Sequence, residues 1–162
     1  MTRVARWVVP ASLAISLGGV SVSTYLTIAH YTTPKILACS STGTVNCERV
    51  TTSAQSTFLG IPVALLGLVW FVTMTSLCLP AAWRAETRLV HLVRLGAAIA
   101  GVGFALWLVY AELFIIGAIC LWCTVAHVLA FGLFVIALLT SPDVLASGDV
   151  DEEERDGQAS YS

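Results

Sequence analysis

The sequence predicts an all-α membrane protein, a bundle of four transmembrane helices. Hydrophobic residues make up 57% of the 162-residue chain, charged residues make up only 11%, and the mean hydropathy is +0.87. Soluble domains carry about 25% charged residues. Four apolar stretches are each long enough to cross a bilayer, which takes roughly 20 residues. No basic stripe indicates nucleic-acid binding, so the composition favours a protein whose surroundings are membrane lipid.

The four stretches divide the chain into spans and connections. They cover approximately residues 7–31, 58–83, 89–113 and 117–140. The first contains no Asp, Glu, Lys or Arg, and the second lies in an uncharged segment between Arg49 and Arg84. We therefore expect one four-helix transmembrane domain at residues 1–141. The remaining residues, 142–162, are acidic and lack an apolar pattern, so we expect a disordered cytoplasmic tail.

The basic residues predict the orientation of the bundle. Those that flank the first span or lie between the second and third are Arg3, Arg6, Arg84, Arg88 and Arg94. The connection after the first span holds only Lys35 and Arg49, and the connection before the fourth holds neither type. Because cytoplasmic loops carry the excess of Lys and Arg, we expect both termini in the cytoplasm. The loop after the first span and the start of the fourth then face the extracytoplasmic side of a multi-pass cell membrane protein, where disulfides persist.

Four of the five cysteines form two pairs of different design on this outer side. Cys120 and Cys123 form a C-x-x-C motif near the start of the fourth span. Both thiols therefore share one helix face, and the amino terminus of the helix favours a thiolate. Cys39 and Cys47 lie in a polar loop whose ends can meet at little entropic cost. Two such pairs predict a relay in which one pair exchanges with a soluble partner and the other passes electrons to an acceptor in the lipid.

Other interpretations of the cysteines stay open. A non-catalytic membrane module could use them as two structural disulfides, or four thiols could handle a metal ion. Resistance to mild reductant would indicate structural disulfides, and bound zinc or copper would indicate a metal site. Cys78 stands alone, so we expect it to be an ordinary packed residue.

Two ionisable residues lie in or beside the spans. His127 comes four residues after Cys123, on the same helix face, where it could bind an acceptor or transfer a proton. A histidine that only packs between helices is the alternative. Glu112 is expected at the outer interface, in contact with water. Trp122 is expected to be an interfacial anchor or a pocket wall.

The order of these motifs resembles the vitamin K epoxide reductase family in its bacterial form, over approximately residues 12–139. The shared pattern is a loop cysteine pair, a serine six residues later, a Gly-x-Pro before the next helix and a C-x-x-C at the head of the fourth. In this chain the pattern comprises Cys39, Cys47, Ser53, Gly60-Ile61-Pro62, Cys120 and Cys123. Bacterial quinone-linked thiol oxidases of the Dsb type place the tight pair in the first outer loop, so the order here disfavours that family.

The resemblance implies a redox-active centre with a defined order of electron transfer. Cys39 would exchange with the substrate protein, and Cys47 would relay to Cys120 through a transient disulfide. Cys123, released as a thiolate, would reduce a quinone of the menaquinone, ubiquinone or vitamin K type. The reaction would support disulfide bond formation.

The resemblance also implies a quinone pocket and a partner. Ser53 would be the hydrogen-bonding serine of the family, and Ser56 and Phe58 would line the pocket together with His127. Many bacterial members carry a fused thioredoxin-like domain that serves as the electron donor. We see no such domain in this sequence, so the resemblance implies that the donor is a separate extracytoplasmic oxidase with a thioredoxin fold.

Overall fold

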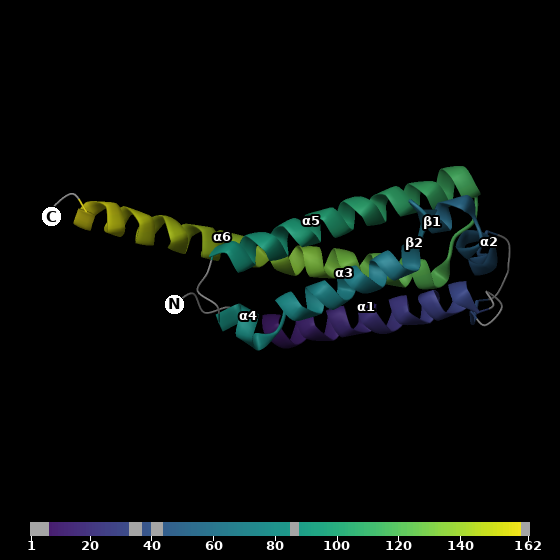
Figure 1. The fold of residues 1–162 in the computed structure, drawn as a ribbon, viewed down its shortest axis with the longest axis horizontal. Coiled ribbons are helices and arrows are strands. Elements are labelled where there is room, and N and C mark those ends of the chain that lie inside the picture. The colour runs from purple at the N-terminus through teal and green to yellow at the C-terminus, as the bar shows by residue number, and fades with distance from the viewer. Residues whose placement is uncertain (1–6, 33–36, 40–43, 85–87, 160–162) are drawn as a thin grey trace.

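The computed structural model describes residues 7–32, 37–39, 44–84 and 88–159, which form an elongated bundle of helices (Figure 1). Its helices are α1 (Val8–Tyr31), α2 (Cys47–Thr51), the 3-10 helix η2 (Ala54–Ser56), α3 (Val63–Leu77), α4 (Pro80–Arg84), α5 (Arg88–Tyr110), the π-helical η3 (Ala111–Ile116) and α6 (Leu121–Ala159). Strands β1 (Thr57–Phe58) and β2 (Ile61–Pro62) form a short antiparallel hairpin. The closest packing joins α1 to α3, α5 to α6 and α1 to α6.

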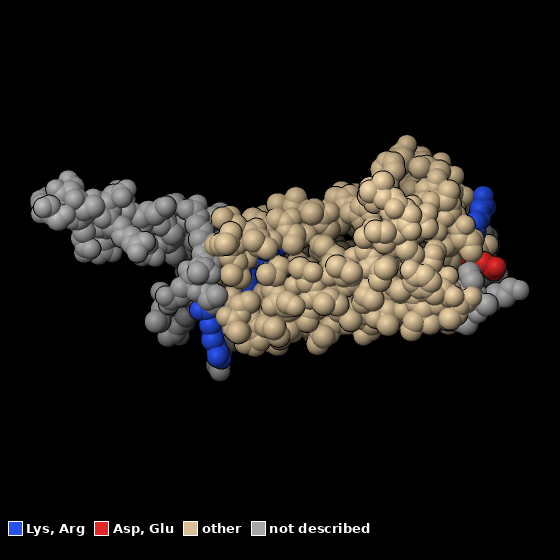
Figure 2. Space-filling model, viewed as in Figure 1, with Lys and Arg blue, Asp and Glu red and all other residues tan. Residues whose placement is uncertain are grey.

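Three helical segments are long and apolar enough to cross a bilayer. They are Val8–Tyr31, Leu89–Ile116 and Leu121–Thr140. The charged side chains visible in Figure 2 lie toward the two ends of the molecule, and the wide face between them is uncharged. The chain is therefore a helical membrane protein. Its orientation in the membrane stays a prediction.

The predicted second span is shorter and more broken than expected. Instead of one helix over 58–83, the structure has a hairpin, the 15-residue α3 and then α4. Leu59 and Gly60 have φ angles of +52° and +80°, as a two-residue hairpin turn requires, and Pro62 directly precedes α3. Alone, α3 is about 22 Å long at 1.5 Å per residue, less than the bilayer core of about 30 Å. A crossing by the second span thus stays a prediction.

The chain beyond residue 141 differs from the expected disordered tail. The backbone of α6 continues as a helix through Pro142 to Ala159 and extends past the other helices (Figure 1). Extending an existing helix avoids the cost of nucleating a new one, which gives a physical reason for the difference.

The two ends of the bundle carry different elements. The start of α1 and all of α4 lie at one end, whereas α2 and the hairpin lie at the other (Figure 1). At the first end Arg94 is only 3% exposed, and its Nε and Nη2 donate to the carbonyl oxygen of Leu77 at 3.0 and 2.5 Å. Its guanidinium carbon also lies 3.6 Å from the ring centroid of Trp83. Arg94 therefore caps the end of α3, where basic groups are favourable.

Small residues allow the close approach of α1 to its neighbours. Along α1 the buried small residues are Ser12, Ser16, Gly19, Ser23 and Ala29. On α5, by contrast, the small residues Gly96, Ala100 and Gly103 are exposed. Gly101 makes the close contact instead, since a Cβ there would lie 2.2 Å from the ring of Trp70.

Gly19→Ala should destabilise the bundle, whereas Gly18→Ala on the same helix should not. A Cβ on Gly19 would lie 2.1 Å from the Phe71 ring, while a Cβ on Gly18 would meet Leu129 at an ordinary 3.7 Å. Overpacking of this kind costs about 1–3 kcal/mol. Thermal unfolding of the two variants in one detergent measures the difference. Equal melting temperatures would contradict the expected packing.

Candidate functional site

The loop cysteines are joined by a disulfide bond. Cys39 and Cys47 are eight residues apart, and their Cα atoms are 6.2 Å apart. Cys47 is the first residue of α2 and is 2% exposed, whereas Cys39 is half-buried. The helix begins here because the side chain of Asn46 accepts a hydrogen bond from the Arg49 N–H at 2.9 Å. Of the two sulfurs, Cys39 is the more accessible.

Two hydrogen bonds to the backbone of Ala38 fix the position of the next residue, Cys39. The N–H of Ala38 donates to the Tyr25 hydroxyl at 3.0 Å, and its carbonyl oxygen accepts from the Trp122 indole at 3.3 Å. The two rings meet edge to face, with centroids 5.0 Å apart. Through this hydrogen bond and ring contact, Trp122 of α6 packs against the cysteine loop.

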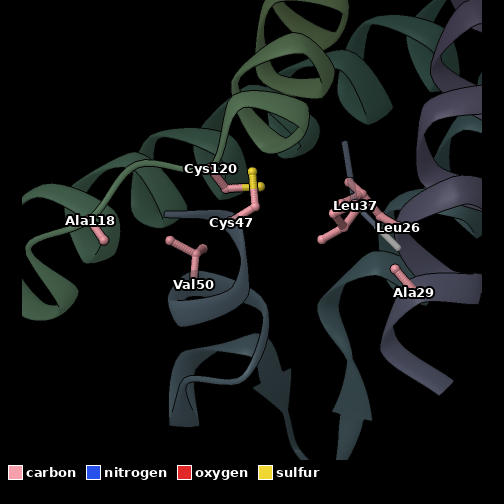
Figure 3. Close-up of a cluster of buried hydrophobic side chains, with 7 residues drawn as sticks. All are labelled: Leu26, Ala29, Leu37, Cys47, Val50, Ala118 and Cys120. Carbon is pink, nitrogen blue, oxygen red and sulfur yellow. The ribbon is translucent and has the colours of Figure 1, made fainter. Parts of the chain in front are cut away.

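Backbone pairing joins the loop to the segment before the C-x-x-C. Val45 and Ile119 form a parallel bridge, in which the Asn46 N–H donates to Ile119 at 3.1 Å and the Ile119 N–H donates to Thr44 at 2.9 Å. Cys47 directly follows Asn46 in one segment, and Cys120 directly follows Ile119 in the other. Both cysteines belong to one cluster of buried side chains. Their side chains point toward one another in Figure 3. The structure thus brings one cysteine of each pair together.

The C-x-x-C is reduced in this arrangement. Cys120 and Cys123 are free thiols; Cys120 is fully buried and Cys123 half-buried. The backbone N–H of Cys123 donates to the Cys120 sulfur at 3.3 Å. Cys120 precedes the membrane-spanning part of α6, and the hydrogen bond from the Cys123 thiol lowers the pKa of Cys120. Both hydrogen bonds therefore favour the thiolate form of Cys120.

A cavity of about 470 Å³ lies beside Cys123. This volume is within the usual range for small-molecule sites, about 300–1,000 Å³. Most of its described walls are apolar side chains from α1, α3, α5 and α6. The residues predicted to contact a ligand all line it: Ser53, Ser56, Phe58 and His127. The cavity therefore combines an apolar interior with a thiol and a few polar groups.

The polar groups differ in what they can offer a ligand. The Ser53 hydroxyl donates to the carbonyl oxygen of Val50, and the Ser56 hydroxyl donates to that of Ser53, both at 2.7 Å. Each serine therefore has lone pairs left, but its hydrogen is already used. In contrast, the buried Nδ1 of His127 has no hydrogen-bond partner among the described residues. His127 is the better donor to a ligand oxygen.

Sequence reasoning misplaced or missed other residues at this site. Glu112, expected in water, is only 6% exposed, and its Oε2 accepts from the Cys120 N–H at 3.5 Å. The signal that could have found it is an ionisable residue at membrane depth. Gln55 also lines the cavity, but no motif singled it out. Cys78 is buried among apolar side chains of a different cluster, as expected for an ordinary packed residue.

Comparison with protein families gives a match over most of the chain. Residues 10–138 match the sequence model described as the vitamin K epoxide reductase family. The matched range contains both cysteine pairs and every residue named above at the cavity.

Proposed function

Because the chain belongs to the vitamin K epoxide reductase family, we propose that it oxidises an extracytoplasmic partner with a thioredoxin fold and passes the electrons to a membrane quinone. Membership makes the protein a membrane thiol–disulfide oxidoreductase. The arrangement of the sulfurs supports the proposed route of the electrons from the partner to the quinone. Cys47 lies in one buried cluster with Cys120, and Cys123 lines an apolar cavity.

The first half of the relay is exchange with the partner. A thiolate of the partner attacks the sulfur of Cys39, the more accessible end of the loop disulfide, and Cys47 leaves as a thiolate. The second thiol of the partner then resolves the mixed disulfide. The partner is left oxidised, and the loop pair is left with two electrons and two thiols.

The second half moves the electrons along the chain. Cys47 attacks the sulfur of Cys120 in the oxidised C-x-x-C, so that Cys123 leaves as a thiolate. Cys39 then attacks Cys47, which restores the loop disulfide and releases Cys120. The products are an oxidised loop pair and a reduced C-x-x-C, the same pattern of bonded and free sulfurs that the four cysteines have in the structure.

The cavity residues fit a quinone. A bound quinone would accept two electrons and two protons and leave as a quinol. His127 is a suitable donor to one of its oxygens, and Phe58 offers a ring that already packs edge to face against Phe104, with centroids 5.9 Å apart. Ser53 can accept a hydrogen bond from the quinol, since its lone pairs are available.

The alternative functions are less well supported. A site of four thiolates cannot form while Cys39 and Cys47 are bonded to each other. Two structural disulfides would leave the C-x-x-C oxidised, whereas Cys120 and Cys123 are free thiols beside a cavity.

Turnover of the purified protein tests the proposal. In detergent, with dithiothreitol or a reduced thioredoxin-fold protein as donor, quinone absorbance should fall catalytically. Cys78→Ala is the matched control, because Cys78 is a buried free thiol that does not line the cavity, and it should retain wild-type turnover. A wild-type protein that reduces no menaquinone, ubiquinone or vitamin K quinone with either donor would contradict the proposal.

His127→Phe should raise the KM for quinone about tenfold, since a lost hydrogen bond of about 1.4 kcal/mol corresponds to that factor. His127→Gln keeps a donor and should lose less. Quinone titrations at saturating dithiothreitol measure both values. The rate at which dithiothreitol reduces the loop disulfide should not change in either variant, because His127 lines the cavity and not the loop. An unchanged KM in His127→Phe would contradict a contact with the quinone.

A further inference from the structure

Glu112 places a carboxyl group inside the membrane domain. Its side chain is 6% exposed, although it lies in the segment that ends the span Leu89–Ile116. Of the described residues that line the cavity, it is the only acid, and none is Lys or Arg. An ionisable group at membrane depth is costly to keep, so it indicates a path for protons or ions.

The backbone around Glu112 directs the carboxyl to the C-x-x-C. Glu112 belongs to the π-helical η3, and π-turns within helices occur frequently at functional sites. Gly117, with a φ of +65°, then reverses the chain, so that the Ala118 N–H donates to the Glu112 main-chain oxygen at 3.1 Å. The side chain contacts the Cys120 N–H at 3.5 Å, which is long for a hydrogen bond and easily exchanged for another partner.

The same cavity holds the other groups that the chemistry needs. Cys123 and His127 line it together with Glu112, but from α6 and not from η3. Oxidation of two thiols releases two protons, and quinone reduction consumes two. His127 follows Cys123 by one helical turn and can serve one proton. His30 also lines the cavity, but of these two histidines and Glu112 it is Glu112 whose side chain contacts Cys120.

We propose that Glu112 is a proton carrier that takes the proton from Cys120 as the C-x-x-C is oxidised. The inference rests on the proposed function, because it adds a residue to the same reaction. In the step, the Cys120–Cys123 sulfur–sulfur bond forms while two S–H bonds break. Two electrons pass to the quinone, and the two protons pass to its oxygens, one of them by way of the Glu112 carboxyl.

The competing explanation is that Glu112 only caps α6. Its contact with the Cys120 N–H satisfies one of the free donors at the start of that helix. Glu112→Gln separates the two roles, because an amide of the same shape still accepts this hydrogen bond but cannot carry a proton.

Glu112→Gln should lower quinone turnover about 100-fold, the lower range for loss of acid–base catalysis, without changing the melting temperature. A second measurement needs no quinone: diamide oxidises the reduced protein, and alkylation with mass spectrometry follows closure of the Cys120–Cys123 disulfide. Closure should slow by a similar factor. Glu112→Asp restores a carboxyl and should recover part of both rates.

Glu48→Gln is the matched control, because Glu48 is an exposed acid of α2 that does not line the cavity. Its two rates should match the wild type. Wild-type rates in Glu112→Gln would overturn the carrier role and leave the proposed function standing, whereas a wild-type protein unable to reduce quinone would overturn both.

A chemical test covers the case in which Glu112→Gln does not fold. A hydrophobic carbodiimide modifies buried carboxyl groups in the wild-type protein, and mass spectrometry measures the labelled fraction at Glu112. The closure rate with diamide should fall in proportion to that fraction. Full labelling of Glu112 with undiminished closure would overturn the proposal.

Discussion

Cys123→Ala should abolish quinone reduction, with a loss of about 1,000-fold or more, as expected when a covalent nucleophile is removed. Cys123 is the cysteine that lines the apolar cavity, whereas Cys120 is fully buried against the loop. No other thiol of the C-x-x-C is placed to reach an acceptor in the cavity. Quinone absorbance with dithiothreitol as donor measures the loss.

The same variant should accumulate a second species, a disulfide between Cys47 and Cys120. Without Cys123, the Cys120 thiolate can still attack Cys47 of the loop disulfide and release Cys39. Only Cys39 is then left to cleave the new bond, so rapid alkylation of the free thiols preserves the Cys47–Cys120 species. Mass spectrometry of digested, alkylated protein detects the linked peptides. Cys120→Ala is the control, since it cannot form this bond. Turnover that survives Cys123→Ala would contradict the relay.

The sequence predicted the chemistry of this site better than its geometry. The C-x-x-C and the loop pair are local patterns, so their residue types and spacing are readable without a fold. Their contact is not local, because it depends on the bridge between Val45 and Ile119, residues far apart in the chain. No periodicity or motif in either segment indicates that pairing.

Membrane residues were the hardest to place for a related reason. Hydropathy identifies a long apolar stretch but does not say which of its faces is buried. Glu112 was therefore assigned to water when it is buried. Likewise, an apolar composition over 58–83 conceals the positive φ angles at Leu59 and Gly60 that make a hairpin before α3.

The access of the two loop sulfurs decides which one meets the partner. Cys39 is half-buried, and Cys47 is 2% exposed in the cluster that contains Cys120. An attacking thiolate must approach in line with the bond that breaks, so the more accessible sulfur should be attacked first. Cys47 is then free to act only inside the protein.

Cys47→Ala should therefore hold the partner as a mixed disulfide through Cys39. In the wild-type chain Cys47 can attack such a mixed disulfide and release the partner, and the variant lacks that route. The bait is a thioredoxin-fold oxidase whose second active-site cysteine is replaced, mixed with the variant under mild oxidant. A non-reducing gel shows the complex, and mass spectrometry identifies the cross-linked peptide.

Cys39→Ala is the matched variant and should behave in the opposite way. It should form no complex with the bait, and its turnover with the reduced partner should fall about 100-fold or more, as for loss of a covalent step. Turnover with dithiothreitol should persist, because a small dithiol can reduce the C-x-x-C without the loop. A bait captured by Cys120, or wild-type turnover of Cys39→Ala with the protein partner, would show that the loop pair does not stand between the partner and the C-x-x-C.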